Sequence, residues 1–415
     1  MTLETCPPAP APVTRGALLD QKSPQLAGRA RALTCAPQQG PQFGSYRAEE
    51  VTWLLKDLSD VALEADIASR EADIQAGRAH YAESLPVEYQ PSAQYQRLYE
   101  AALNRSARRV AHAVGFVTEQ VLAARGADPV LVSLARAGTP VGILMRRWAA
   151  AVHGRRLPHY AISIVRGRGI DVNALAYIAS RHDPTTAMFV DGWTGKGAIT
   201  RELLSAVEDA NALLGTSFPS DIAVLADTGR CVRFFGTRDD FLIPSACLNS
   251  TVSGLVSRTV LNDALIGEHD FHGAKQYRDL AAVDQSAAFL DAVSVHFDTD
   301  LVDEVSRQRD RRGDGRQHRG RQHDGVRPDW SGWAAVEQVA ADHGIENINL
   351  VKPGVGETTR VLLRRVPWKV LVRPDRLDEL QHVLLLAEQR GVPVVPVDGL
   401  AYSCIGLIEP KGTDQ

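Results

Sequence analysis

The residues with the clearest chemical potential lie between Ala187 and Thr200, where an apolar run ends at Asp191 and a turn rich in Gly and Thr follows. This order predicts a buried strand, a loop that fits a phosphate group and the start of a helix. Backbone N–H groups at such a helix start, with Thr194 and Lys196 beside them, suit a phosphoester. Asp191 would hold sugar hydroxyls or a metal ion. The loop therefore predicts a phosphorylated sugar or nucleotide as ligand, and the alternative is a tight turn without a ligand.

The spacing of the glycines separates this loop from two common phosphate motifs. A Walker A loop has four residues between its glycines and a Ser or Thr after its Lys. Here two residues separate Gly192 from Gly195, and Gly197 follows Lys196. The G-x-G-x-x-G fingerprint of dinucleotide binding is absent as well. The loop therefore indicates neither a P-loop protein nor a dinucleotide-binding protein.

A second loop, Ser133–Pro140, closes an earlier apolar run. Arg136 lies where its guanidinium could clamp a diphosphate with two hydrogen bonds, and Thr139 with Pro140 is typical of a helix start. We expect this loop and the Asp191 loop to open on the same edge of a sheet, because ligands of parallel sheets lie at the carboxyl ends of the strands. The alternative is an ordinary turn with an exposed Arg.

Two further polar turns follow apolar runs. Asp240 could join Asp191 in holding a magnesium ion with a diphosphate, because Mg²⁺ prefers one or two carboxylates together with phosphate oxygens. The segment Arg166–Asp171 combines two Arg with flexible Gly and suits an anion. A surface turn explains either segment equally well.

Apolar runs and helical patterns alternate along the chain, which favours a doubly wound parallel sheet. Residues 47–150 are mainly helical by pattern, and strands alternating with helices follow. The expected helices are Val51–Leu63, Tyr95–Ala124, Pro140–Val152 and Ile199–Leu214. The expected strands are Val130–Leu134, Tyr160–Val165, Met188–Val190 and Ile222–Ala226.

The 415 residues exceed the usual size of one domain. Residues 1–40, which are rich in Pro, predict a disordered leader, and residues 41–306 form the first folded domain. Residues 307–328 predict a flexible linker, because residues 307–327 hold eight Arg and three Asp, a net charge of +5. Residues 329–415 return to an α/β pattern and predict a small second domain.

Charge and cysteine content limit the classes of function that are expected for this chain. The net charge of −4 shows no global affinity for polyanions, so any nucleic-acid surface must be local. The sequence shows no membrane-spanning run and no signal-peptide pattern, which predicts a cytoplasmic protein without membrane partners. Five scattered Cys without C-x-x-C pairs fit a reducing compartment and argue against disulfides.

The second domain carries a pattern suited to RNA. Two glycines, Gly354 and Gly356, permit close backbone approach, and Glu357 can accept a hydrogen bond from a base amino group. Basic residues recur at helical spacing and suit RNA phosphates. The segment resembles the Gly-x-x-Glu-x-x-basic signature of Pelota-like RNA-binding domains. The predicted RNA-binding residues are Gly354, Gly356, Glu357, Arg360 and Arg364.

Several longer blocks carry a wider resemblance. They are Phe43–Tyr46, Val51–Leu55, Ile164–Asp171, Phe189–Gly197 and Gly236–Arg258. Together these blocks resemble the phosphoribosyltransferase-like proteins encoded with bacterial tellurite-resistance stress genes, a family also labelled cysteine protease StiP that ends in a Pelota-like domain. The resemblance implies a type I phosphoribosyltransferase-like sheet with helical N-terminal additions, a stress-response role and partners from the same gene cluster.

The phosphoribosyltransferase resemblance implies a set of ligand-binding residues. Asp191 and Arg136 would be catalytic, Asp191 and Asp240 would hold Mg²⁺, and RNA would be recruited by the second domain. Where that family carries two adjacent acids, Gly192 follows Asp191 here. The residues implied for the phosphate and the ribose are Ala137, Gly138, Thr139, Gly192, Thr194, Gly195, Lys196 and Gly197.

The residues also offer candidates for the catalytic groups of a cysteine protease. Cys247 precedes an apolar helical pattern, and a thiol at a helix N-terminus is a better nucleophile. His269 or His272 could take its proton, with Asp270 or Asp240 orienting the ring. A buried structural Cys is the competing interpretation. The main hypothesis is thus a phosphoribosyltransferase-like enzyme, and the alternatives are a cysteine protease and a non-catalytic nucleotide-sensing, RNA-binding regulator.

Overall fold

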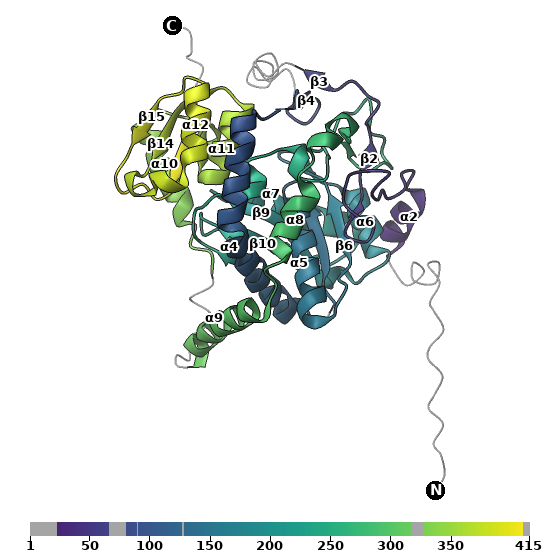
Figure 1. Cartoon of the computed structure of the whole chain (residues 1–415). Coiled ribbons are helices and arrows are strands. Elements are labelled where there is room, and N and C mark those ends of the chain that lie inside the picture. The colour runs from purple at the N-terminus through teal and green to yellow at the C-terminus, as the bar shows by residue number, and fades with distance from the viewer. Residues whose placement is uncertain (1–22, 66–79, 89, 127, 318–326, 410–415) are drawn as a thin grey trace.

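Six apolar runs pair into one parallel sheet in the order β1-β6-β5-β9-β10-β11. The computed structural model describes residues 23–65, 80–88, 90–126, 128–317 and 327–409 (Figure 1). Strands β5 and β10 are buried along their whole length, because helices cover both faces of the sheet. The strands are β1 Thr52–Trp53, β5 Val130–Leu134, β6 His159–Ile162, β9 Ala187–Thr194, β10 Ile222–Asp227 and β11 Phe234–Thr237.

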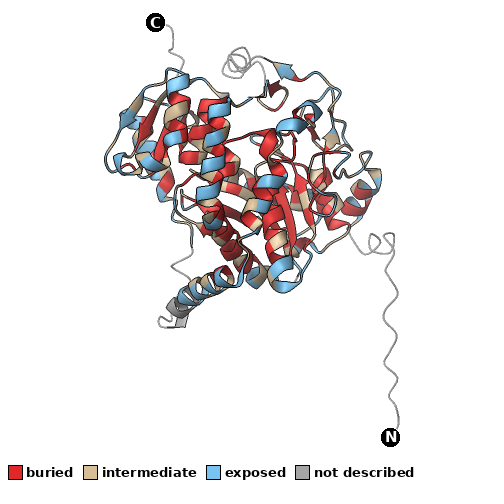
Figure 2. Cartoon of the chain, viewed as in Figure 1, coloured by how far each residue is buried: buried red, intermediate tan, exposed pale blue. Residues whose placement is uncertain are grey.

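Two layers of helices enclose this sheet, with buried residues on both of its faces (Figure 2). One face packs against α4 (Ala93–Arg125) and α5 (Gly138–His153), and α8 (Ser286–Ser294) packs on these two helices. The other face packs against α6 (Val172–Ala179) and α7 (Ala198–Leu214), and α2 (Pro24–Ala32) packs on these two helices. The predicted α/β class with a parallel sheet is therefore confirmed.

The strand order reverses between β5 and β9, which lie side by side in the middle of the sheet. Ser133 of β5 pairs with Val190 of β9, so the loops that follow these strands open on the same edge. Ligands of doubly wound sheets bind at such a reversal. The expectation that the two loops meet at one edge is confirmed.

The C-terminal domain, drawn in yellow beside α4 in Figure 1, has a four-stranded sheet of its own in the order β13-β16-β14-β15. Only the β14–β15 pair within this sheet is parallel. The helices are α10 Ser331–Asp342, α11 Val355–Arg364 and α12 Gln381–Gln389. The strands are β13 Val351–Pro353, β14 Pro367–Val372, β15 Val394–Pro396 and β16 Cys404–Ile408.

Short strand pairs and one long helix complete the described part of the chain. Helix α9 (Thr299–Gln317) follows α8 and contacts α4. None of the helices described here combines the length and the apolar character needed to cross a membrane. The short pairs are β2 Lys56–Asp57 with β12 Gly273–Ala274, β3 Glu64–Ala65 with β4 Leu85–Pro86, and β7 Ile164–Val165 with β8 Gly169–Ile170.

The structure corrects three expectations about the elements. The helix expected over Val51–Leu63 is wrong, because this segment forms β1 and β2. The disordered leader is wrong for α2, whose apolar side packs on α6 and α7; residues 1–22 lie outside the described residues. The linker expected from residue 307 begins instead as α9, which continues to Gln317, and residues 318–326 are not described.

Two adjacent leucines on α7 provide a matched test of this packing. Leu203 is fully buried against the sheet, whereas Leu204 is 48% exposed. We expect Leu203→Ala to lower the free energy of unfolding by about 2–5 kcal/mol through the cavity it leaves. Leu204→Ala should change it by about 0.5 kcal/mol or less. Thermal melts of both variants check this expectation, and equal shifts in melting temperature would contradict the assigned orientation of α7.

Candidate functional site

The β9–α7 loop, where a phosphate was expected, faces the C-terminal domain. Nζ of Lys196 donates to the backbone carbonyls of Ile348 and Val351, the latter at 3.0 Å. The hydroxyl of Tyr402 donates to the carbonyl of Gly195 at 2.8 Å. Burial lowers the pKa of Lys196 to about 7. The amine of Lys196, which was expected to bind a phosphate, therefore donates to backbone carbonyls of the second domain instead.

The glycines of this loop and of its neighbour serve close backbone packing. A Cβ at Gly195 would lie 2.9 Å from the carbonyl oxygen of Pro353 in the second domain. Gly197 has a positive φ of 77° at the start of α7, and a Cβ there would meet the ring of Trp330 at 2.3 Å. A Cβ at Gly138 would lie 2.1 Å from the carbonyl oxygen of Val190. Chain packing thus accounts for all three glycines.

Asp240, expected as a magnesium ligand, joins the two domains. Its Oδ1 accepts the backbone N–H of Val355 at 2.9 Å, and its Oδ2 accepts that of Ser403 at 2.7 Å. The hydroxyl of Ser403 donates to the backbone carbonyl of Asp240 at 2.7 Å. Asp240, a residue of the first domain, therefore caps the N-terminus of α11 in the second domain. Burial raises the pKa of its carboxyl to about 6.

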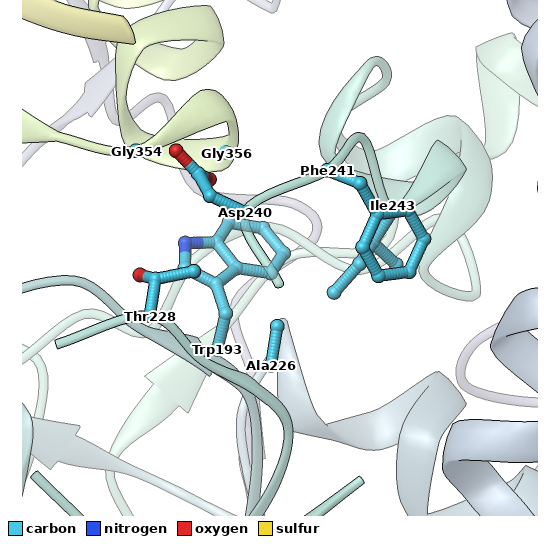
Figure 3. Close-up of a pocket in the computed structure, with 8 residues that line it drawn as sticks. All are labelled: Trp193, Ala226, Thr228, Asp240, Phe241, Ile243, Gly354 and Gly356. Atoms are coloured by element: carbon cyan, nitrogen blue, oxygen red, sulfur yellow. The ribbon is translucent and has the colours of Figure 1, made fainter. Parts of the chain in front are cut away.

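The indole of Trp193 packs against the second domain at the same place. In Figure 3 the ring of Trp193 and the carboxylate of Asp240 both point toward the turn that carries Gly354 and Gly356. A Cβ at Gly356 would lie 2.5 Å from the indole, and the guanidinium of Arg360 lies 4.2 Å from the ring centroid. The cavity left between these groups is about 10 Å³, far below the usual volume of a small-molecule site.

Asp191 and Thr194 lie within β9, because the strand continues to Thr194 instead of ending at Asp191. Oδ1 of Asp191 accepts the N–H of Gly192 at 2.7 Å. Burial raises the pKa of Asp191 to about 6, and the charge of Arg360 acts against this rise. The hydroxyl of Thr194 donates to Oδ1 of Asp227 at 2.7 Å. Neither side chain is aligned with backbone N–H groups around an anion.

Arg136 has partners within its own domain. Its Nη1 donates to the carbonyl of Val256 at 3.0 Å and lies 3.5 Å from a carboxylate oxygen of Glu88. Ala137 precedes the first residue of α5, and Thr139 is fully buried in the first turn instead of capping the helix. Arg136 and Arg360 line a second cavity of about 20 Å³, which is too small for a pentose diphosphate.

The residues proposed for magnesium do not fit that ion. Both carboxylate oxygens of Asp240 accept backbone N–H groups, which leaves Asp191 as the remaining acid of the proposed pair. Mg²⁺ needs oxygen ligands in near-octahedral arrangement. Among the residues that the structure describes, no group of three or more His, Cys, Asp or Glu could hold a metal ion.

Cys247, the expected protease nucleophile, is a core residue. It is 1% exposed, lies at the end of a single 3₁₀ turn, Pro244–Ala246, and belongs to the main apolar cluster. Burial raises the pKa of its thiol to about 12. Its described partner is Tyr95, whose hydroxyl donates to the Cys247 carbonyl at 3.1 Å. The thiol thus lacks both access and the cationic neighbour that activates a cysteine.

The segment His269–His272 lies beside a different cysteine. The backbone N–H of Thr34 donates to the carbonyl of His269 at 3.1 Å. The thiol of Cys35 then donates to Oδ1 of Asp270 at 3.0 Å, and Nζ of Lys56 lies 2.6 Å from Oδ2. No contact among the described residues joins this segment to Cys247, so the predicted arrangement of Cys247 with His269 or His272 does not form.

Cys35 is partly exposed, unlike Cys231, Cys247 and Cys404, which are buried. Burial and the neighbouring Asp270 raise the pKa of its thiol to about 11, while the N–H of Phe271 and the charge of Lys56 act in the opposite direction. Hydrogen bonds from Cys35, Lys56 and Thr34 hold the pKa of Asp270 well below its usual range, although partial burial opposes them.

Sequence reasoning missed this cysteine because residues 1–40 were taken as disordered. The available signal was the apolar spacing of Leu26, Ala27 and Ala30 shortly before it, which are the residues that α2 buries. Helix α2 packs on α6 and α7 and so fixes the chain that leads to Cys35.

The two histidines near Cys35 differ in their surroundings. Nδ1 of His272 lies 2.9 Å from the hydroxyl oxygen of Ser163, and the backbone N–H of His272 donates to Oδ2 of Asp171, which caps α6. Nδ1 of His269 is buried and has no hydrogen-bond partner within the described residues. Nδ1 of His269 is therefore unpartnered within the described residues, whereas His272 is held by its neighbours.

Gly354 immediately precedes α11, Gly356, Glu357 and Arg360 lie within its first six residues, and Arg364 is its last residue. Gly354 and Gly356 contact Asp240 and Trp193, and Glu357 lies one helical turn from Arg360, with 3.2 Å between the charged atoms. The side chain of Arg364 lies outside the described residues. The two glycines of the predicted pattern thus face the first domain, while Glu357 and Arg360 remain partly exposed.

Comparison with known proteins identifies the family. A family model described as "Tellurite-like stress resistance cysteine protease StiP" matches residues 44–294, and one described as "PELOTA RNA binding domain" matches residues 330–410. The chain is 34% identical over 384 residues to a protein of Acinetobacter baylyi named "Cysteine protease StiP", covering 89% of this chain and 94% of that protein. The chain therefore belongs to the StiP family and ends in a Pelota RNA-binding domain.

These matches correct the main functional hypothesis. The phosphoribosyltransferase interpretation is wrong, because the family model and the relative both carry the name of a cysteine protease. The physical reason lies at the sheet edge, where Lys196 and Asp240 bind the backbone of the second domain. The resemblance to the StiP family and to the Pelota domain is confirmed.

The contacts of Cys35 predict its reactivity. Replacing Asp270 by Asn removes the charge that disfavours the thiolate, so the pKa of Cys35 should fall toward its ordinary value. Labelling of Cys35 by iodoacetamide at pH 8 should then be about tenfold faster or more, since one pKa unit changes the thiolate fraction tenfold. Mass spectrometry of the labelled peptide measures the rate.

Glu268→Gln is the matched control for this experiment. Its exposed side chain lies in the same segment, and the change removes the same charge without touching the thiol. An equal increase in labelling with both variants, or none with Asp270→Asn, would contradict the assigned contact.

Proposed function

We propose that this chain is a cysteine-dependent peptidase that carries an RNA-binding module. The observation that supports the peptidase most strongly is the 34% identity to the Acinetobacter baylyi protein, which extends over nearly the full length of both chains. The family model named for the same activity covers most of the first domain. Nearly complete coverage supports carrying over the activity together with both domains.

We assign the nucleophile to Cys35 on the grounds of access and neighbours. A peptidase cysteine must reach the substrate carbonyl and must lose its proton during attack. Cys35 has a partly exposed thiol, a cation in Lys56 and a backbone N–H from Phe271 near its sulfur. The buried thiols of Cys231 and Cys247 both have a pKa raised to about 12 by burial, which disfavours this role.

His269 is the residue proposed to accept the proton from Cys35. Its backbone pairs with Thr34 next to the nucleophile, and its Nδ1 has no hydrogen-bond partner within the described residues. Transfer of the thiol proton to the imidazole leaves a thiolate that attacks the peptide carbonyl carbon. The imidazolium then returns the proton to the leaving amine, and water hydrolyses the resulting thioester.

In this proposal the contact with Asp270 keeps Cys35 inactive until a substrate binds. With a pKa of about 11, only about one thiol in ten thousand is ionised at pH 7. Asp270 holds the proton on the sulfur and also neutralises Lys56. A substrate that hydrogen-bonds to Asp270 and turns it away would leave Lys56 facing the sulfur, which would favour the thiolate. Peptidase activity in this proposal is therefore switched on by substrate contact.

The second domain supplies the proposed RNA contact. Its match to the Pelota RNA-binding family over residues 330–410 supports this assignment. The strand order around β5 and β9 also supports a phosphoribosyltransferase-like architecture for the first domain, without the activity of that class. The nucleotide ligand, in contrast, receives no support from the geometry of Lys196 and Arg136.

Cleavage of fluorescently labelled casein, with and without total bacterial RNA, tests the peptidase. Cys35→Ser should reduce activity to background, and His269→Asn should lower kcat/KM by about 10²–10⁴ through loss of the base. Cys247→Ser, at a residue 1% exposed, should retain activity once folding is confirmed by circular dichroism.

Two outcomes would contradict the proposal. If Cys35→Ser retained activity and a folded Cys247→Ser variant lost it, the nucleophile would be the buried Cys247. No cleavage by the natural chain under either condition, or cleavage that survives replacement of all five Cys, would exclude a cysteine peptidase.

A further inference from the structure

The face of α11 that carries the RNA-type pattern is covered by the first domain of the same chain. Asp240 accepts the N–H of Val355 at the start of the helix, and Trp193 packs on Gly356. Arg360, one turn further along, stacks on the same indole at 4.2 Å from the ring centroid. Three elements of RNA recognition, namely a helix N-terminus, a glycine surface and an Arg, thus have partners within the protein.

Those partners have the chemical character of RNA itself. A carboxylate at the N-terminus of a helix takes the place that a phosphate takes, because both accept the unpaired N–H groups there. An indole packed against glycine and stacked by a guanidinium resembles an unstacked base, which proteins hold by the same contacts. Asp240 and Trp193 therefore stand where a phosphate and a base would bind α11.

We propose that the first domain masks the RNA-binding face of α11 by imitating RNA, so that domain docking and RNA binding at this face exclude each other. This inference rests on the proposed RNA binding by the second domain. RNA that displaces Asp240 and Trp193 separates the two domains at this edge. The protein is thus closed without RNA and open with it.

The composition of the interface suits such an exchange. Lys196 donates to two carbonyls, Asp240 accepts two N–H groups, and Tyr402 donates to the Gly195 carbonyl. Each of these groups regains hydrogen bonds from water when the domains part. The interface also has an apolar part, because Val355 and Leu362 of α11 belong to the same buried cluster as the core of the first domain. The polar contacts are the part that RNA replaces.

Binding of a fluorescently labelled pool of random-sequence RNA to the full chain tests the proposal. Asp240→Ala and Lys196→Met each weaken docking without changing the second domain. Because apparent affinity scales with the open fraction, both variants should bind RNA about tenfold more tightly or more, as expected for the loss of one charge-assisted contact. Fluorescence anisotropy gives the dissociation constants.

Asp239→Ala is the matched electrostatic control. It removes the same charge as Asp240→Ala from the adjacent residue, whose side chain is exposed and paired with Arg109. It should leave RNA affinity within about twofold, since exposed ion pairs contribute little. Lys196→Met removes a positive charge, which by electrostatics alone would weaken RNA binding. Tighter binding by this variant therefore cannot come from charge.

Hydrogen exchange separates failure of this inference from failure of the proposed RNA binding. Added RNA should speed exchange of the Ser403 amide in the natural chain, because this N–H loses Asp240 as acceptor. Tight RNA binding with unchanged Ser403 exchange and unchanged affinities in both docking variants would overturn the masking proposal and leave RNA binding intact. No RNA binding by any variant would overturn both.

Discussion

The need to satisfy buried polar groups governs the carboxyl edge of the sheet. A charged group taken out of water without a partner is strongly destabilising, so Lys196 and Asp240 must find hydrogen bonds wherever the fold places them. Both find them in the backbone of the second domain. In a ligand-binding protein of similar topology this edge remains open to a small molecule. Here the same positions are occupied by another part of the chain, and this constraint fixes how the two domains meet.

The same constraint explains why the elements were predictable and the site was not. Long apolar periodicities specified α4, α5 and α7 and the central strands, because burial against a sheet leaves a clear pattern. Segment Val51–Leu63 was misjudged because two-residue strands are too short to show alternation. The role of Lys196 depended on Ile348 and Val351, which are remote in sequence. A glycine-rich loop indicates that a ligand or another part of the chain approaches closely. The sequence around Gly195 does not show whether that neighbour is a phosphate or Pro353.

Burial also determines which cysteines can react. Cys247 has a polar sequence context that resembles a helix cap, yet its thiol lies in the main apolar cluster and titrates only at high pH. Cys35 comes from a segment of low apparent order and acquires Asp270 and Lys56 as neighbours only because α2 packs on α6 and α7. Reactivity follows the folded environment of a thiol more closely than its local sequence. The candidate catalytic cluster is accordingly a tertiary feature without a contiguous motif.

Helix α7 physically joins the domain interface to the neighbourhood of Cys35. Its N-terminus follows Gly197, beside the contacts of Lys196, and its 17 residues extend about 25 Å. At its other end the hydroxyl of Ser23 donates to the carbonyl of Leu214, and Ser23 caps α2, the helix that leads to Cys35. A packed helix transmits displacement because close-packed interiors deform little. The contacts of Lys196 thus lie beside the N-terminus of α7, and α2 is joined to its C-terminus through Ser23.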